Sequence, residues 1–456
     1  MGLSKPISLD YTINDLYAID NEGEFNIALL YYPLQGDPNG ATTAPKFVYQ
    51  YELEGNREGP EPPIPLAAKV VPQRYGFSAG KMSLLMPDFD SASCNSPGFD
   101  TVPTHLDDTY RVFSQVKSDQ QPMLRIVKQL GSLSLDPGSQ IAVLLPTDDL
   151  AHLPHLMDPE VHYEILSKRG LAMSGLPTPP SEVIDSVLDP ASKQDMTHLK
   201  HEISRMIEPI NKHKLPFMIK LPQSISGDGV AKVSTNSDRE RTKELLTTLL
   251  EKILQHVNPS NHHLYPCSLV LQDFIRGDVV ALSLFVTKKG RPIFIACCQQ
   301  RFDEGGHWTG GSISYREQST FSQKYADISE KVATFLHEKG YYGPAGVDVI
   351  TDQSDQRQYI IDLNVRVTGT FHFGPLAGHF VRRGLFEAAT VIHDFSCSRM
   401  AFEEAFQDEI EHGSVIINGW AHESMRRSHG AITVGGRDAS DLSQLVLKIT
   451  TLAILN

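Results

Sequence analysis

Hydrophobic and polar residues alternate along residues 346–369, GVDVITDQSDQRQYIIDLNVRVTG, at the period of two that a β-strand requires. The segment from Asp352 to Arg357 is entirely polar, so it predicts the turn of an antiparallel hairpin. This pairing sets Ile350 opposite Ile360 and Asp348 opposite Asp362. Side chains two positions apart share a face. The face that we expect in the core carries Val347, Val349, Ile361, Leu363 and Val365.

The opposite face of this hairpin collects Asp348, Asp362 and Asn364. Directly opposed Cβ atoms lie about 5 Å apart, so two carboxylates there repel each other unless a cation lies between them. Two carboxylates and an amide oxygen are hard ligands suited to Mg²⁺. The alternative is a polar face that meets only water. Arg366, Thr368 and Gly369 follow directly and favour a binding site.

Helical and strand-like segments alternate along the rest of the chain, which predicts a mixed α/β (α+β) fold. Residues 239–257 carry a helical stripe of Leu245, Leu249, Ile253 and Leu254. Asp158 is expected to cap a helix with Pro159 at its first position, and Gly175 to end it. Strand-like runs include SQIAVLLPTDD, LPFMIKLP and CSLVLQDFI. Residues 376–456 are expected to be mostly helical, with one strand near GSVIINGWAH.

The length of 456 residues predicts two or three domains. We expect an N-terminal α/β domain with loop insertions over 1–150, a central domain over 151–285, and a C-terminal domain with a helical tail over 286–456. The net charge of −14 argues against a general nucleic-acid-binding surface, but leaves room for a local basic pocket.

Five cysteines without CxxC spacing indicate buried free thiols and a reducing compartment. The N-terminus has no apolar segment typical of a signal peptide, and no apolar run reaches the roughly 18 residues of a membrane span. These features predict a cytoplasmic protein without a membrane partner.

A Gly/Ser loop follows the strand-like run FMIK, which ends at Lys220. Such a loop can offer backbone N–H groups and hydroxyls to phosphate oxygens, with the lysine as a point charge. An ordinary turn after a strand is the alternative reading. The loop residues that carry the phosphate hypothesis are Ser224, Ser226, Gly227 and Gly229.

Five segments in this order resemble the ATP-grasp superfamily, between about residues 145 and 375. They are LSKRGLAMSGLPTPP, FMIKLP with SISGDGV, LVLQDFIRGDVVALSLFV, GPAGVDVI and YIIDLNVRVTG. The resemblance implies an ATP-grasp fold preceded by a pre-ATP-grasp α/β domain. The sequence differs from the family pattern at three places. The loop has fewer glycines, Gln272 and Asp278 stand where glutamate is commoner, and Asp362 is shorter than the usual glutamate.

The resemblance also assigns expected roles to residues of this sequence. Lys168 and Lys220 would hold the ATP phosphates, and the Gly/Ser loop would cover them. Arg366 would steady an acyl phosphate or a tetrahedral intermediate, and Asp278 would bind the ribose. The adenine would lie against Gln272, Asp273 and Ile275. One or two Mg²⁺ ions, with Mn²⁺ as a substitute, would be held by Asp348, Asp362 and Asn364.

The activity that this resemblance implies is ATP-dependent ligation of a small carboxylic acid to an amine, through an acyl phosphate, with release of ADP and phosphate. Peptide-like or specialised metabolism is the expected context. Arg301 would bind a carboxylate or phosphate of the substrate, and His307 or Trp308 would touch it. Dimers are common in the family, so a homodimer is compatible with the sequence. The alternatives are a small-molecule kinase and a non-catalytic ATP-binding scaffold, and a thiol or hydroxyl could replace the amine.

Overall fold

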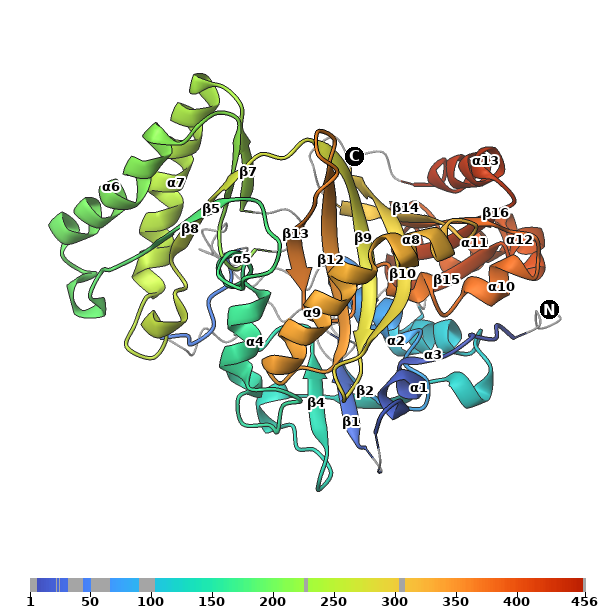
Figure 1. Cartoon of the computed structure of the whole chain (residues 1–456). Helices are drawn as coiled ribbons and strands as arrows, with labels where there is room; N and C mark the ends of the chain where they lie inside the picture. Colours follow the sequence, from blue (N-terminus) through green and yellow to red (C-terminus); the bar gives the residue numbers. More distant parts are fainter. Residues whose placement is uncertain are drawn as a thin grey trace.

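The computed structural model describes residues 6–21, 23, 25–31, 44–50, 66–89, 103–224, 229–302 and 308–453. Its strands form three sheets, with helices packed between and around them (Figure 1). Short 3₁₀ helices connect several elements: η2 (Ser118–Gln120), η3 (Leu130–Ser132), η4 (Asp148–Leu150), η5 (Pro190–Ser192), η6 (His262–Leu264) and η7 (Phe371–Phe373).

The N-terminal sheet is parallel and has the strand order β3-β2-β1-β4. Alternate residues of its central strands point into two different hydrophobic cores. Leu29 and Leu84 belong to one core, and Leu30 and Leu85 belong to the other. Parallel strands are typically covered on both faces in this way. The elements of this part are α1 (Ile13–Ala18), β1 (Ile27–Leu30), α2 (Leu66–Gly76), β2 (Ser83–Pro87), α3 (His105–Phe113), β3 (Met123–Val127) and β4 (Gln140–Val143).

A small antiparallel sheet, β5-β8-β6-β7, follows two short helices. Its core is formed with two long helices that lie side by side over one face (Figure 1). The elements are α4 (Pro159–Leu166), α5 (Lys168–Ala172), β5 (Ser181–Asp185), α6 (Met196–Lys212), β6 (Phe217–Lys220), β7 (Val230–Val233), α7 (Asn236–His256) and β8 (Ser268–Asp273).

The third sheet is antiparallel, with the order β13-β12-β9-β10-β11-β14-β16-β15. Its strands are β9 (Gly277–Val286), β10 (Pro292–Phe302), β11 (Trp308–Ser314), β12 (Gly343–Asp352), β13 (Gln358–Asn364), β14 (Glu387–Phe395), β15 (Val415–Ser424) and β16 (Arg427–Gly436). The helices are α8 (Gln318–Lys324), α9 (Ala326–Glu338), α10 (Ala377–Val381), α11 (Arg399–Ala405), α12 (Gln407–His412) and α13 (Ala439–Thr450).

The predicted mixed α/β class is confirmed, but the prediction for the C-terminal tail is wrong in part. The tail contributes three strands, β14, β15 and β16, to the large sheet, where one was expected. The physical reason is burial on both faces. Nine of the ten residues of β16 are buried, so the strand lacks the alternation by which a half-exposed strand is recognised.

Two helix predictions need correction. Asp158 and Pro159 begin α4 as expected, but Ser167 interrupts the predicted helix and caps α5. The stripe predicted for α7 is also rotated, because Leu245 is 58% exposed. The buried face of α7 is Thr242, Leu246, Leu250, Ile253 and Leu254.

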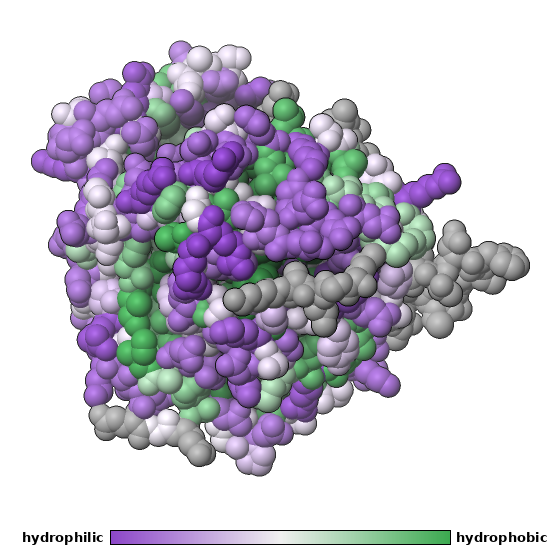
Figure 2. Space-filling model, turned by 90° about the vertical axis from the view of Figure 1, so that its right-hand side faces the viewer, coloured by the Kyte–Doolittle hydropathy of each residue, from purple (hydrophilic) through white to green (hydrophobic). Residues whose placement is uncertain are grey.

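The part of the chain that the structure describes contains no helix long and apolar enough to cross a bilayer. Hydrophilic residues predominate on the face shown in Figure 2. Cys267, Cys297 and Cys298 are buried free thiols, as the sequence predicted, whereas Cys397 is free but only partly buried. Cys94 lies outside the residues that the structure describes. The domain limits at residues 150 and 285 stay predictions; β9 of the large sheet runs across residue 285.

Candidate active site

The hairpin of β12 and β13 places Asp348 directly opposite Asp362, as predicted. The predicted pair of Ile350 and Ile360 is wrong, because Ile350 pairs with Tyr359 and Val349 with Ile360. A β-bulge with Ile361 as its extra residue shifts the register between these pairs. Ile360 is consequently fully buried. Ile361, which was expected in the core, is only partly buried and lines a cavity.

The bulge also frees a backbone acceptor for Lys220. The Lys220 ammonium donates to the carbonyl oxygen of Ile361 at 2.7 Å. Lys220 ends β6 and is only 7% exposed. Burial lowers its pKa to about 8, although the Asp362 carboxylate opposes this shift. Strand β6 of the small sheet therefore places a buried cation in contact with the hairpin of the large sheet.

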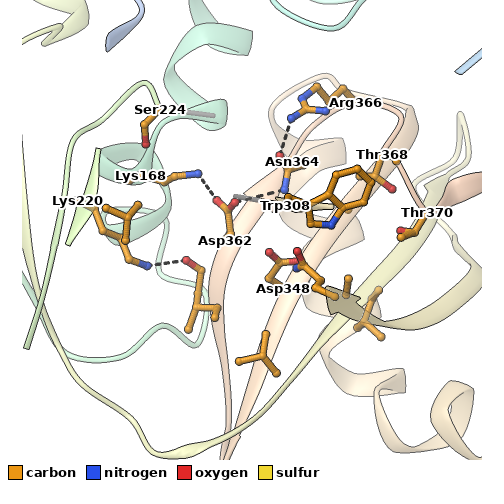
Figure 3. A pocket seen from close by; sticks show the side chains of 18 of the residues that line it. Lys168, Lys220, Ser224, Trp308, Asp348, Asp362, Asn364, Arg366, Thr368 and Thr370 are labelled. Carbon is orange, nitrogen blue, oxygen red and sulfur yellow. Dashed lines mark hydrogen bonds and ion pairs between the residues drawn. The ribbon is translucent and has the colours of Figure 1, made fainter. Parts of the chain in front are cut away.

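Lys168 reaches the same hairpin from α5 and forms an ion pair with Asp362 (Figure 3). Its neighbour Arg169 binds Asp185 of β5 through two hydrogen bonds of 2.7 and 2.8 Å. Asp185 also accepts a hydrogen bond of 2.7 Å from the Ser268 hydroxyl of β8. These contacts fix α5 on the small sheet and so hold the Lys168 side chain toward the acids.

The two facing aspartates have opposite pKa shifts. Burial and the Asp362 charge raise the pKa of Asp348 to about 7. Burial also opposes ionisation of Asp362, but the ammonium groups of Lys168 and Lys220 outweigh it and lower the pKa of that carboxyl. This difference is expected when two carboxyls share one site and one of them takes the nearby cations.

Asn364 and Arg366 continue the polar face of β13. The Asn364 amide lies 3.4 Å from Oδ2 of Asp362, and its Oδ1 accepts a hydrogen bond of 3.0 Å from Arg366 (Figure 3). The residues that the structure describes contain no cluster of three or more His, Cys, Asp or Glu side chains that could hold a metal. The three oxygen-bearing side chains still fit Mg²⁺, because this ion is commonly bound by one or two carboxylates together with water and phosphate oxygens.

These groups line one cavity of about 650 Å³ between the small sheet, the large sheet and the N-terminal part. Figure 3 shows Lys168, Lys220 and Ser224 on one side of it, and the acids of β12 and β13 facing them. The predicted site residues that line the cavity are Lys168, Lys220, Ser224, Gln272, Asp273, Ile275, Asp348, Asp362, Asn364 and Arg366.

Ser224 shows a feature that the sequence did not reveal. Its hydroxyl is buried and has no hydrogen-bond partner among the described residues, although it lies at the cavity wall. A buried hydroxyl without a hydrogen-bond partner lowers the stability of the folded protein. A ligand oxygen at this position could accept its hydrogen bond.

Other predicted site residues do not line the cavity. Asp278 and Arg301 are exposed strand residues outside its wall, and Gly229 has a left-handed φ of +69° just before β7. The roles proposed for these three residues stay predictions. Ser226, Gly227 and His307 lie outside the residues that the structure describes.

The structure adds residues to the cavity that sequence reasoning missed. Arg74 and Tyr75 enter from α2, and Thr370 follows β13. Thr368 and Gly369, which the sequence placed beside the acids, also line the cavity. Trp308, which was expected to touch the substrate, is also part of the wall. No local pattern marks Arg74 or Tyr75 as site residues, because Trp308 and Arg366, which meet them in the cavity wall, lie more than 200 residues further along the chain.

The small sheet and the adjoining helix α5 present lysines, the large sheet presents paired acids, and a cavity lies between them. This arrangement agrees with the ATP-grasp fold that the sequence resemblance implies. The match to a family model agrees: residues 208–370 match the ATP-grasp domain. This match and the arrangement of the sheets together show an ATP-grasp fold in this part of the chain.

Solved structures share this fold at low sequence identity. An L-amino acid ligase from Bacillus licheniformis has 11% identity and a TM-score of 0.50, over 96% of this chain and 100% of its own. A phosphoribosylamine–glycine ligase from Thermotoga maritima has 13% identity and a TM-score of 0.50, over 94% and 97%. An N5-carboxyaminoimidazole synthetase from Staphylococcus aureus has 11% identity and a TM-score of 0.49, over 95% and 99%. No curated protein matches the chain by sequence.

Proposed function

We propose that this protein is an ATP-dependent carbon–nitrogen ligase that joins a small carboxylic acid to an amine. In this reaction a carboxylate oxygen attacks the γ-phosphorus of ATP and ADP leaves. The amine nitrogen then attacks the carbonyl carbon of the acyl phosphate, and phosphate leaves. Two structures of the same fold, described above, carry the name of ligases, which supports this reaction class.

One observation carries the proposal. Lys168 of α5 and Lys220 of β6 converge on the paired acids Asp348 and Asp362 across one cavity. Transfer of a phosphoryl group needs cations around the phosphate oxygens and carboxylates to hold a metal ion. The cavity volume of about 650 Å³ falls within the range of small-molecule sites.

In this proposal Lys168 and Lys220 bind the phosphate oxygens of the nucleotide, and the unpartnered Ser224 hydroxyl donates to one of them. The adenine would lie between the end of β8 and the hinge that follows it, against Gln272, Asp273 and Ile275. Gln272 is 4% exposed and donates to Ser181 at 3.0 Å, which holds its side chain in place.

Mg²⁺, when bound, would supply charge neutralisation between the nucleotide and the acids. Asp348, Asp362 and Asn364 are the side chains that would hold it, and binding requires Asp348 to lose its proton. Arg366 would stabilise negative charge that develops on the transferred group.

The biological setting of the reaction is a finer part of the proposal. We place it in peptide-like or specialised metabolism, and in the cytoplasm because the buried thiols are free. A homodimer and the nature of the acceptor group stay predictions. A kinase would use the same phosphate-binding groups, and a scaffold would bind the nucleotide without turnover.

Product analysis separates these functions. Purified protein is incubated with MgATP and a panel of carboxylic acids and amines, and ADP and free phosphate are measured with each partner alone and with both. A ligase releases ADP and phosphate only when both partners are present. ADP with one partner and no free phosphate would indicate a kinase. Nucleotide binding without either product would leave a scaffold.

A further inference from the structure

Arg74 is a buried cation without an acidic partner in the wall of the cavity. Arg74 is only 9% exposed, and among the described residues no carboxylate forms an ion pair with it. It donates one hydrogen bond of 3.0 Å to the Tyr75 hydroxyl, while its Nε–H is buried and has no partner in the part of the chain that the structure describes. A buried charge without a counter-ion is unfavourable, so this position is suited to an anion.

Two aromatic rings compensate part of this charge. The Arg74 guanidinium lies 4.8 Å from the ring centre of Tyr75 and 5.3 Å from that of Trp308. Cation–π contacts stabilise a guanidinium but provide no acceptor for its N–H groups. The need for an oxygen acceptor at Nε therefore remains.

Tyr75 connects this corner to the hairpin of acids. Burial raises the pKa of its hydroxyl, but the guanidinium groups of Arg74 and Arg366 outweigh burial and lower it. Arg366 in turn donates to Asn364 at 3.0 Å. The positive corner is thus linked to the proposed nucleotide and metal site through Arg366 and Asn364.

The helix that carries Arg74 is held firmly in place. Gln73 is fully buried, donates to the Trp420 carbonyl at 3.0 Å and accepts from the Trp420 amide at 2.7 Å. These bonds join α2 to β15 of the large sheet. A guanidinium on a fixed helix is prepared for binding before the ligand arrives.

The cavity wall beside Arg74 is apolar. One stripe of α2 and the residues after β4 contribute it: Ala67, Ala68, Val71, Leu144 and Leu145. Small and branched aliphatic side chains leave room for an apolar group and offer it no hydrogen bonds. The ligand that matches this corner combines an anionic group with an apolar body.

We propose that Arg74 binds a free carboxylate of the non-nucleotide substrate, with the apolar part of that substrate against α2. This inference rests on the proposed function, because it names a substrate feature for the same cavity. A guanidinium fork matches the two oxygens of a carboxylate. One unpaired cation also suits a single negative charge better than a phosphate, for which the two lysines provide the other site.

The test uses the full-length protein with MgADP and two pairs of probes: phenylacetate with phenylacetamide, and hexanoate with hexanamide. Binding is followed by ligand-observed NMR titration. The variants are Arg74→Met, which removes the charge, and Arg74→Lys, which keeps it without the fork. Arg241→Met is the matched control, because that side chain is 82% exposed on α7.

We expect the wild type and Arg241→Met to bind at least one carboxylate and neither carboxamide. Arg74→Met should weaken carboxylate binding by at least about tenfold, and Arg74→Lys should retain an intermediate affinity. All variants should bind MgADP equally. Failure of the wild type to bind MgADP, with carboxylate binding retained, would contradict the proposed function and leave the role of Arg74 supported.

Several results would overturn the inference. They are equal binding of a carboxylate by wild type and Arg74→Met, equal binding of a carboxylate and its carboxamide, and binding of MgADP without either carboxylate. Inorganic phosphate is tested in parallel. If phosphate binds through Arg74 and the carboxylates do not, the site recognises a phosphate and the carboxylate assignment is wrong.

Discussion

Lys168 and Asp362 form an ion pair between α5 and β13, although 194 residues separate them in the chain. The pair joins the two sheets that enclose the cavity. The positive member comes from α5, which is bound to the small sheet through Arg169 and Asp185, and the negative member comes from β13 of the large sheet. When ligands bind, Lys168 could leave Asp362 and contact phosphate oxygens. Asp362 would then be free to bind a metal ion.

Replacement of Asp362 by asparagine should remove turnover without unfolding the protein. The variant keeps the shape of the side chain but loses the charge that would hold a metal ion. We expect ADP formation to fall by at least about 100-fold, the scale on which loss of one key electrostatic group acts. A coupled ADP assay measures the rate, and circular dichroism checks the fold. The control is Asp327→Asn, which removes an acid that is 73% exposed on α9. A folded Asp362→Asn variant with wild-type turnover would remove Asp362 from the site.

Asp348 should make the nucleotide-free protein less stable as pH rises from about 4 to about 7. Its pKa is about 7 in the folded state against 3.8 in the unfolded chain. The folded state therefore binds a proton in this window that the unfolded state has lost, and stability falls as that proton is released. Urea unfolding at several pH values measures the slope. Asp348→Asn should flatten it, and a variant with the wild-type slope would contradict this assignment.

Lys220 should have the opposite effect at higher pH. Its pKa is about 8 when folded and 10.5 when unfolded, so the unfolded state binds more protons between these values. Stability attributable to this residue therefore rises as pH increases through this range. Lys220→Met should remove the rise in urea unfolding experiments above pH 8. A wild-type pH dependence in this variant would show that Lys220 keeps an ordinary pKa.

A buried ion cluster between α3 and the C-terminal part should be important for stability. Asp108 has a fully buried side chain. It lies 3.7 Å from Arg399, whose side chain is 2% exposed, and accepts a 2.6 Å hydrogen bond from His422. Arg399→Met removes a positive charge next to the buried Asp108 carboxylate. This substitution should lower the free energy of unfolding by about 3–5 kcal/mol. Chemical denaturation measures this loss. Arg427→Met, at a side chain that is 54% exposed, should change it by only about 0.5 kcal/mol. Similar losses in both variants would contradict the assigned role of the buried cluster.

The three buried thiols should not react in the folded protein. Burial raises the pKa of Cys267, Cys297 and Cys298, so their reactive thiolate forms are disfavoured. Labelling with a thiol reagent followed by peptide mass spectrometry should find these residues unmodified until denaturant is added. Rapid modification of any of them under native conditions would show that its surroundings are open to solvent.

The sequence predicted those site residues that share one local pattern. Asp348 and Asp362 were paired correctly because the polar turn and the period of two determine which strand positions face each other. The bulge at Ile361 was missed because periodicity alone does not reveal an extra residue in one strand. Its consequence, the carbonyl that binds Lys220, was therefore also missed.

Residues that depend on tertiary packing were beyond sequence reasoning. Arg74 lies in the run KVVPQRYG, which contains Pro72 and shows no pattern of a binding site. Its environment is created by Trp308 of β11 and Arg366, which other parts of the chain bring to α2. The strands β14 and β16 were missed for a related reason, since burial on both faces removes the alternation that reveals a strand.

We propose that the acids of the β12–β13 hairpin hold a divalent cation together with the nucleotide phosphates. The most direct test of this proposal is a crystal structure of the protein with a non-hydrolysable ATP analogue and Mg²⁺. We expect density for a metal ion beside Asp348 and Asp362, with Lys168 and Lys220 in contact with the phosphate oxygens. Bound nucleotide with no metal ion at these carboxylates and with both lysines turned away from its phosphates would contradict it.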